Sequence, residues 1–425
     1  SGNAGIRRAS GAVHRDCGKP MFSFDAGIGF NLIFGSGGHI FGMTGSSVRW
    51  LMAGLGTLAL ALAACGSGTR PGASGVAMAP SYVAAPAYVV SLPVPRVMTP
   101  RRNDPPRALV ERVDALVRGF PGIAGVAIRA VDEGWTVEAG GRRRMPQQSV
   151  SKLWVAMTVL DQRDSGRLKL DDPVTLYPAD LTLFHQPIAS LVKPSGYQTT
   201  VGALLARALT QSDNTANDRL LSLVGGPSAV RAFVERKQLG DIRFGPGERL
   251  LQSKTAGLTW QQSYSLGNSF EIARSRLSPD VRAAALEAYI ADPPDGAAPL
   301  AIADALARLA RGELLSETST RYLLSTMGAS VTGRARLRAA LPPGWSIQHK
   351  TGTGQELGRR NAGFNDVGLL TAPDGRRYAI AVMIGDTTRP MHERQLLIQA
   401  AASALTGYRT DNRALASTDD DAPGS

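Results

Sequence analysis

Residues 346–384 read SIQHKTGTGQELGRRNAGFNDVGLLTAPDGRRYAIAVMI, and they contain three segments with the character of β-strands. These segments are 346–350, 366–371 and 378–384, and glycine-containing polar stretches separate them. An amphipathic helix is expected to follow at about 390–405. Three strands in succession, with no helix between them, are typical of an antiparallel sheet.

The amino-terminal side of the folded part adds two further strands. Residues 107–118 place apolar side chains on one face of a helix, and short strands follow at 125–131 and 135–139, joined by Asp-Glu-Gly as in a hairpin. Between the two groups of strands, about 149–340 has the periodicity of helices. Since strands from both chain ends must share one sheet, we expect an α+β fold: a three-layer arrangement of a five-stranded antiparallel sheet flanked by helices, with an inserted all-helical subdomain.

Composition limits the class of protein. Of 425 residues, 43% are hydrophobic and 19% charged, which supports a sizeable core and excludes wholesale disorder. The only cysteines, Cys17 and Cys65, exclude a disulfide scaffold or a cysteine-rich zinc site, and the five scattered histidines predict no metal. The net charge of +12 becomes +9 without residues 1–64, which carry five basic and two acidic side chains, and this excess favours contact with anionic polymers of a cell envelope. Because no nucleic-acid recognition motif appears, we expect no nucleic-acid partner.

The first part of the chain has the pattern of a targeting segment. Residues 50–64 (WLMAGLGTLALALAA) form an uncharged apolar run after Arg49. The run is too short for a membrane span and is typical of a secretory signal. The boundary LAACG at 62–66 resembles that of bacterial lipoproteins, in which the cysteine, here Cys65, is lipidated. A plain signal peptide that contains a cysteine is the alternative.

We therefore expect four parts along the chain. These are a leader at 1–64, a Pro/Ala-rich tether at 65–105, a folded domain at 106–410 and a disordered tail at 411–425. The tether is predicted from the eight prolines among the 41 residues of 66–106, because so many prolines preclude a helix.

Three short motifs carry the candidate chemistry. The first is Ser149-Val-Ser-Lys152, followed by the apolar run LWVAMTVL. If Ser149 opens a helix, Lys152 lies on the same face one turn later, where a lysine with a depressed pKa can take the proton of the hydroxyl. A capped helix with a solvated lysine is the alternative for this motif on its own.

The second motif is Ser212-Asp213-Asn214, and the third is KTGTG at 350–354. An Asx-rich helix cap is the alternative for the second motif. The third follows a strand, and its lysine, threonines and glycines suit the binding of a carboxylate at a strand edge. It lacks the spacing of a phosphate-binding loop or a dinucleotide-binding loop.

In this order, the three motifs resemble the S-x-x-K, S-D-N and K-T-G signature of class A β-lactamases and penicillin-binding proteins. The resemblance covers about 106–410 and extends to the stretches SDNTANDRLLSLVGGPSAVRAFV, ALARLARGELLS and FNDVGLLTAPDG. It implies a serine hydrolase that acts on cyclic amides and needs no cofactor.

The resemblance also implies roles for the motif residues. Ser149 would be the nucleophile, Lys152 its base or part of a proton relay, and Ser212 a bridge between Lys152 and Lys350 that passes the proton to the leaving nitrogen. The backbone N–H groups of Ser149 and Thr353 would form the oxyanion hole. The expected substrate-binding residues are Asn214, Lys350, Thr351, Gly352 and Thr353.

A glutamate that follows the S-D-N motif in the sequence distinguishes a β-lactamase from a peptidase of the same family, because it determines how the enzyme is deacylated. Class A enzymes use one to activate the water that deacylates the enzyme, and Glu248 lies at a similar spacing, with Gln252 expected to position the water. The family has asparagine where this chain has Gln252, and 253–298 is longer than the family's loop. A solvated loop glutamate is the alternative.

The leading prediction is a serine β-lactamase. The alternatives are a D-Ala-D-Ala carboxypeptidase acting on peptidoglycan stem peptides, for which His349 is suggestive, and a penicillin sensor that stays acylated. We expect a monomer in the bacterial periplasm, attached to a membrane only through a lipid at Cys65.

Overall fold

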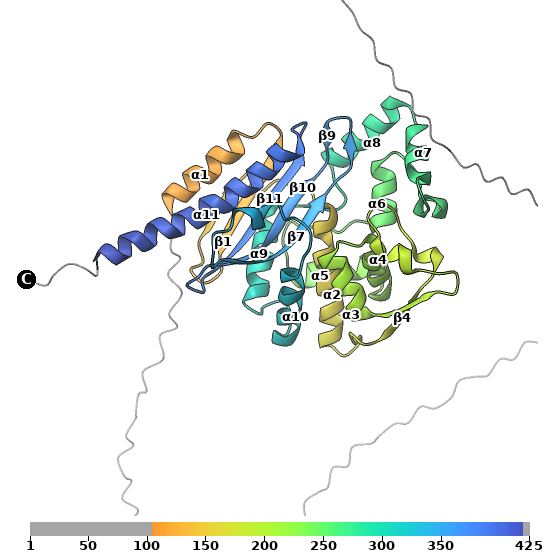
Figure 1. Cartoon of the computed structure of the whole chain (residues 1–425), viewed down its shortest axis with the longest axis horizontal. Coiled ribbons are helices and arrows are strands. Elements are labelled where there is room, and N and C mark those ends of the chain that lie inside the picture. Colours follow the sequence, from red (N-terminus) through yellow and green to blue (C-terminus); the bar gives the residue numbers. More distant parts are fainter. Residues whose placement is uncertain (1–103, 420–425) are drawn as a thin grey trace, which may run out of the picture. The chain divides into compact units, whose positions relative to one another are not determined.

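The computed structural model describes residues 104–419, with side chains described as far as Tyr408. Five strands form an antiparallel sheet in the order β2-β1-β11-β10-β7 (Figure 1), which confirms the predicted sheet. Strands from both ends of the described chain lie side by side in the centre of the sheet, where β1 pairs with β11. The five strands are β1 (Ile123–Ala130), β2 (Thr136–Ala139), β7 (Ser346–Thr353), β10 (Phe364–Thr371) and β11 (Arg377–Asp386).

The central strands are apolar on both faces because helices cover both. On β11, Ile380 and Val382 face one hydrophobic cluster, while Ala381 and Met383 face another. This alternation follows from the two-residue period of a strand. A strand buried on both sides is therefore continuously apolar and shows little amphipathic pattern.

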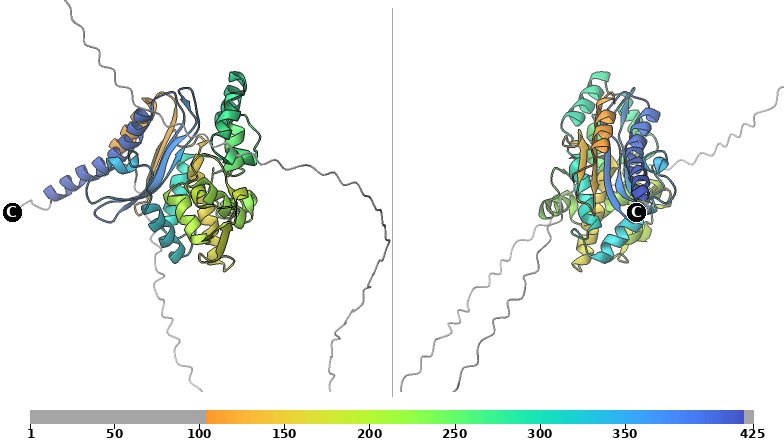
Figure 2. Two further views of the ribbon diagram at one scale, coloured as in Figure 1. Left: turned by 45° about the vertical axis from the view of Figure 1, so that its right-hand side comes forward. Right: turned by 90° about the vertical axis from the view of Figure 1, so that its left-hand side faces the viewer.

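Two helices from opposite ends of the described chain cover one face, α1 (Arg107–Arg118) and α11 (Met391–Asp419), as Figure 2 shows. Leu109 and Val113 of α1 are fully buried against this face. The other face is covered by α9 (Pro299–Ala310), which contacts β1, β10 and β11. The result is the predicted three-layer arrangement.

Most of the remaining elements lie in 149–340, the part that the sequence predicted as an all-helical insertion. Three details differ from that prediction: β4 and β5 form a small hairpin, β6 pairs with β3, and α9 packs on the sheet. The helices are α2 (Lys152–Asp164), α3 (Val201–Thr210), α4 (Asn214–Leu223), α5 (Gly226–Arg236), α6 (Glu248–Thr255), α7 (Ser269–Ser275), α8 (Pro279–Ala291) and α10 (Glu317–Gly328). The short strands are β3 (Met145–Pro146), β4 (Pro173–Leu176), β5 (Tyr197–Thr200), β6 (Gly296–Ala297), β8 (Glu356–Leu357) and β9 (Arg360–Asn361).

The ends of the folded part differ in how far the structure reaches. Helix α11 continues to Asp419, beyond the predicted end near 405 and into the tail expected at 411–425. The leader, Cys65 and nearly all of the tether lie outside the described residues. Within residues 104–419, no helix combines the length and the apolar character that a membrane span needs.

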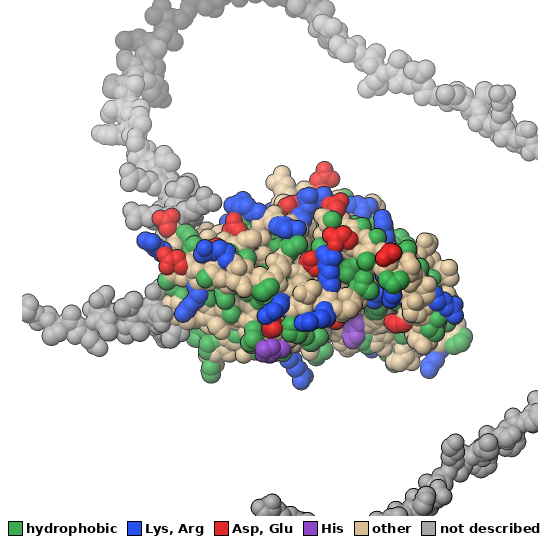
Figure 3. Space-filling model, turned by 90° about the horizontal axis from the view of Figure 1, so that it is seen from above, with side chains coloured by type: hydrophobic (Ala, Val, Ile, Leu, Met, Phe, Trp, Pro, Cys, Tyr) green, Lys and Arg blue, Asp and Glu red, His purple; other side chains and the backbone are tan. Residues whose placement is uncertain are grey.

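The face in Figure 3 carries Lys and Arg side chains interspersed with Asp and Glu.

Candidate active site

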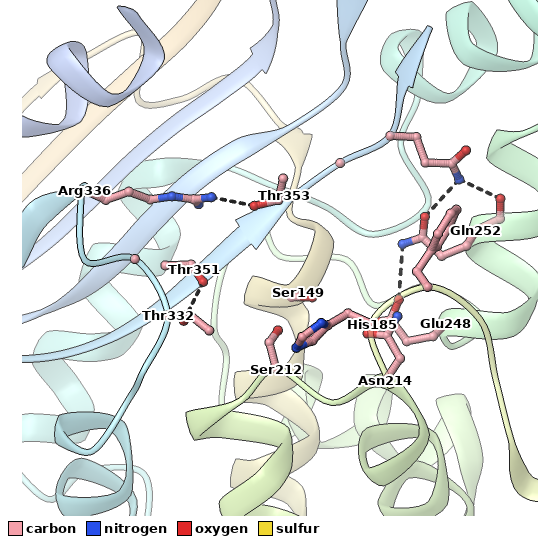
Figure 4. Close-up of a pocket in the computed structure, with 14 residues that line it drawn as sticks. Ser149, His185, Ser212, Asn214, Glu248, Gln252, Thr332, Arg336, Thr351 and Thr353 are labelled. Atoms are coloured by element: carbon pink, nitrogen blue, oxygen red, sulfur yellow. Dashed lines mark hydrogen bonds between the residues drawn. The ribbon is translucent and has the colours of Figure 1, made fainter. Parts of the chain in front are cut away.

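The three sequence motifs meet at one cavity of about 430 Å³, beside the edge strand β7. Figure 4 shows its side chains, which come from β7, from the turn before α2, from the start of α4 and the residues before it, from α6 and from the segment between α10 and β7. Residues from all three motifs line it, among them Ser149, Ser212, Asn214, Thr351 and Thr353. Segments more than 60 residues apart in the sequence therefore share one site, as predicted.

Ser149 lies in a single 3₁₀ turn, Gln148–Ser151, immediately before α2. The side chain of Lys152, one turn later, is completely buried, and its Nζ lies 2.8 Å from Ser149 Oγ. The helix begins at Lys152, three residues later than the sequence predicted, but serine and lysine still share one face. This contact excludes the solvated lysine that the motif on its own also allowed.

Lys152 has two further partners. Its Nζ donates a hydrogen bond to Asn214 Oδ1 at 2.9 Å and forms a buried ion pair with Glu248 Oε1. Glu248 is itself only 4% exposed, so it is not the solvated loop residue that the sequence also allowed. A buried charge is tolerated when it is paired and hydrogen-bonded, and this lysine meets both conditions.

Ser212 contacts the lysine of the third motif. Lys350 Nζ donates to Ser212 Oγ at 2.8 Å and to the carbonyl of Thr351 at 2.9 Å. Burial, together with the charges of Lys152 and Arg336, holds the pKa of Lys350 well below its ordinary value. Ser212 was expected to bridge Lys152 and Lys350. The structure shows its hydrogen bond with Lys350, while the Nζ of Lys152 contacts Ser149 instead.

The S-D-N motif provides both a helix cap and side chains of the cavity, the two interpretations that its sequence allowed. Asp213 caps α4, because its Oδ1 accepts from the N–H of Ala216 at 2.9 Å and its Oδ2 from the N–H of Ile188 at 2.6 Å. Burial raises the pKa of this aspartate. The residues on either side, Ser212 and Asn214, line the cavity.

Backbone strain is concentrated around the site. Within the described chain, four non-glycine residues have a positive φ: Gln148, Phe184, Ser212 and Gln238. Phe184 and Ser212 line the cavity, and Gln148 directly precedes Ser149. Such conformations cost about 1–3 kcal/mol each and persist where the surroundings fix them, commonly at functional sites.

Gly352 lets β7 approach the turn that carries Ser149. A Cβ atom on Gly352 would lie 2.3 Å from the carbonyl oxygen of Gln147, which no side chain tolerates. The glycine of K-T-G therefore brings Thr353 close to the nucleophile, in keeping with an oxyanion hole between their N–H groups.

Arg336 is a cavity residue that the motifs do not contain. It lies between α10 and β7, and its Nη2 donates to Thr353 Oγ1 at 2.5 Å. Its Nη1 donates to the carbonyls of Gly352 and Asn365, and its guanidinium carbon lies 3.8 Å from the ring centre of Phe364. Burial lowers the pKa of Arg336 to about 10, so the side chain stays charged at neutral pH.

Helix α6 presents Glu248 and Gln252 one turn apart. The backbone N–H of Glu248 donates to Asp218 Oδ1 at 2.9 Å, and the N–H of Arg249 donates to Oδ2 of the same carboxylate at 3.2 Å. Asp218 thus satisfies two free donors at the start of the helix. Gln252 Nε2 lies 3.2 Å from Glu248 Oε2, so the amide contacts the carboxylate directly.

His349 does not reach the cavity. Its ring is fully buried, and Nδ1 lies 2.8 Å from Asp366 Oδ1. The other oxygen of Asp366 accepts from the N–H of Leu337 at 3.1 Å. His349 is therefore part of the support beneath β7, which removes the hint of peptidase chemistry taken from its position before the lysine.

Further cavity residues escaped the sequence analysis. Besides Arg336 they include Phe184, His185, Thr332 and Gln355. His185 was visible only as an isolated histidine, and none of the others belongs to a recognisable motif. Within residues 104–419, His, Cys, Asp and Glu side chains form no group of three or more suited to a metal ion.

Comparisons with known proteins agree with this geometry. Residues 108–408 match the profile of the β-lactamase enzyme family. The chain is 28% identical over 308 residues to the extended-spectrum β-lactamase PER-1 of Pseudomonas aeruginosa, which covers 72% of this chain and 88% of the relative. It is 28% identical over 296 residues to β-lactamase CTX-M-97 of Escherichia coli, covering 70% and 87%.

A solved structure supports the same assignment. A β-lactamase from Chitinophaga pinensis, 27% identical, superposes with a TM-score of 0.58 and covers 70% of this chain and 97% of that one. The family profile spans well over half of the chain, and the sheet and the three motifs fit it. The chain therefore belongs to the class A β-lactamase family.

Proposed function

We propose that this chain is a serine β-lactamase that hydrolyses the β-lactam amide through an acyl-enzyme on Ser149. The observation that carries the proposal is the contact of one buried lysine, Lys152, with both Ser149 and Glu248. Penicillin-binding peptidases of similar fold lack this glutamate and deacylate slowly. A buried carboxylate next to the nucleophile therefore favours a hydrolase over a peptidase or a sensor that stays acylated.

Acylation begins when the Ser149 hydroxyl loses its proton. When Lys152 passes a proton to Glu248, its neutral amine accepts the proton of Ser149, whose oxygen attacks the lactam carbonyl. The C–N bond of the ring then breaks. The nitrogen takes a proton from Ser212, which is replenished through Lys350, 2.8 Å away. Lys152 then passes the proton of Ser149 to this relay and recovers its own from Glu248, so that the carboxylate is ionised again before deacylation.

Binding involves both walls of the cavity. The N–H groups of Ser149 and Thr353 stabilise the negative charge on the carbonyl oxygen. Asn214 faces the side-chain amide of the substrate, and Thr351 and Gly352 belong to the strand along which the substrate lies. Lys350 is buried and engaged with Ser212, whereas Arg336, which donates to Thr353, lines the cavity and supplies a second positive charge for the carboxylate.

Deacylation uses the carboxylate of Glu248 as the general base. A water loses a proton to Glu248 and attacks the ester carbonyl, and Ser149 Oγ leaves with a proton from Lys152. Glu248 then returns its proton to Lys152, with which it is paired, and the starting state is restored. Because the lysine touches both residues, one proton reservoir serves both halves of the reaction.

We also propose that the chain works in the periplasm as a monomer that a lipid on Cys65 anchors to a membrane. The apolar run and the boundary at 62–66 support the anchor, and the family supports only the periplasmic location. Cys65→Ser should move the protein from the membrane fraction to the soluble periplasmic fraction. An unchanged distribution would remove the anchor from the proposal.

The activity is tested by mixing the purified full-length chain with a chromogenic cephalosporin. Colour development and intact mass are followed together. Rapid multiple turnover, abolished by Ser149→Ala, is the expected result. A stoichiometric burst that leaves a persistent adduct would indicate the peptidase or the sensor instead.

A further inference from the structure

A directed chain of hydrogen bonds links the end of β7 to the loop behind the nucleophile. Gln355 Nε2 lies 3.0 Å from Gln252 Oε1, and Gln252 Nε2 lies 3.0 Å from Gln148 Oε1. Gln148 Nε2 lies 2.7 Å from the hydroxyl of Tyr289, which lies 3.0 Å from Asp295 Oδ1. All five side chains are buried.

Asp295 fixes the direction of this chain. An ionised carboxylate only accepts hydrogen bonds, so Tyr289 uses its single proton there, and its oxygen accepts from the amide of Gln148. The oxygen of Gln148 then faces the NH₂ group of Gln252, whose own oxygen faces the NH₂ group of Gln355. Turning one amide over would leave buried polar atoms unpaired, at a cost of about 1–3 kcal/mol each.

The orientation of Gln252 matters because it touches Glu248. One proton of its NH₂ group goes to Gln148 and the other to Glu248 Oε2, at 3.2 Å. Lys152 occupies Oε1 of the same carboxylate. Both protons of the Gln252 amide are thus engaged, and its contribution is to hold Glu248 rather than to donate to a water.

Gln355 is the residue that grips Gln252 from outside α6. It donates to the side-chain oxygen of Gln252 and also, at 2.8 Å, to its main-chain carbonyl. These contacts join two segments 103 residues apart, the end of β7 and the helix that carries Glu248. Without them, the side chain of Gln252 would be held only at its NH₂ end, by Gln148 and Glu248.

We propose that Gln355 is a positioning residue for deacylation, which fixes the Gln252 amide in the orientation that holds the Glu248 carboxylate beside Lys152. The proposal rests on the proposed hydrolysis by Ser149 and Glu248. It assigns to Gln355 no role in acylation, since Lys152 and Ser149 contact each other without it.

The test compares rate constants in the full-length chain. Gln355→Met keeps the length of the side chain and removes its donor. A misplaced catalytic group commonly costs about 100-fold, so the acyl-enzyme, followed by intact mass, should decay roughly 10- to 100-fold more slowly. The acylation rate should stay within about twofold of the wild type. Gln198→Met, an exposed glutamine on β5, is the matched control and should change neither rate.

Gln355→Glu supplies a readout that a purely structural role would not move. Its ionised carboxylate only accepts and repels the oxygens of Gln252, whereas its protonated form donates to them. The deacylation rate of Gln355→Glu divided by that of Gln355→Met should therefore rise as the pH falls. If Gln355→Met fails to fold, the deacylation rate of Gln355→Glu divided by that of the wild type tests the proposal in the same way.

Two results would overturn the inference. Provided that the wild type turns over, one is a Gln355→Met variant that deacylates at the wild-type rate. The other is a ratio of deacylation rates that does not change with pH. If the wild type itself is never acylated, or never released, the proposed function fails instead.

Discussion

Lys152 Nζ lies 2.8 Å from Ser149 Oγ, and the lysine side chain is completely buried. Its charge is balanced by Glu248, which is also buried. Removing one partner of such a pair leaves the other charge uncompensated, whereas removing both leaves none. This relationship separates the contribution of the pair to stability from its contribution to chemistry.

The first prediction uses that separation. Lys152→Met should lower the free energy of unfolding by about 3–5 kcal/mol, because Glu248 is left without its cation. The double variant Lys152→Met/Glu248→Gln should recover most of this loss. Denaturant unfolding measures both, and additive losses would show that the two charges do not stabilise each other.

The same variants separate folding from catalysis. Acylation should fall by a factor of roughly 10²–10⁴ in Lys152→Met, because the proton acceptor is gone. It should stay low in the double variant even though stability returns. Recovery of acylation together with stability would exclude Lys152 as the acceptor.

A second prediction concerns Arg336. Hydrogen bonds to charged groups contribute about 1.5–3 kcal/mol, so Arg336→Ala should raise KM for carboxylate-bearing β-lactams roughly 10- to 100-fold. The effect on kcat should be smaller, since the residue does not touch the reacting atoms. Arg334→Ala, an exposed arginine of the same segment, is the control for general loss of charge. Equal effects of the two substitutions would contradict a specific role for Arg336.

A third prediction follows from Asp295, whose pKa is raised to about 6 mainly by burial. Between pH 4 and 6 the folded state keeps a proton that the unfolded state has lost, so stability falls as the pH rises. The loss of stability between pH 4 and 6 amounts to about 3 kcal/mol, because each unit by which the pKa of Asp295 is raised corresponds to 1.36 kcal/mol. Asp295→Asn should therefore gain stability over the wild type from pH 4 to 6 and keep that gain at pH 7. Unfolding free energies measured across this range test it, and a difference that is independent of pH would contradict it.

The sequence was sufficient for the sheet and for the centre of the site. Three motifs of fixed composition and order predicted that Ser149, Lys152, Ser212 and Lys350 meet, and the five strands followed from their apolar character. The β4–β5 hairpin was missed because its strands have four residues each and lie 20 residues apart, too short for a clear alternation.

Arg336 and Gln355 could not be found from the sequence. Arg336 lies in a stretch without regular structure, where no periodicity marks a residue that points into a cavity. Gln355 acquires its role from contact with α6, more than 100 residues earlier in the chain. Glutamine amides have no chemical signature of their own, so only their partners in the fold identify them.

The central claim is that Glu248 activates the water that releases Ser149. The most direct measurement is the intact mass of Glu248→Gln beside that of the wild type, taken at intervals after addition of a chromogenic cephalosporin. We predict that the wild type turns over without accumulating an adduct, while Glu248→Gln becomes acylated once per molecule and retains the acyl group. Turnover by Glu248→Gln at the wild-type rate, or a wild type that stays acylated, would contradict the account.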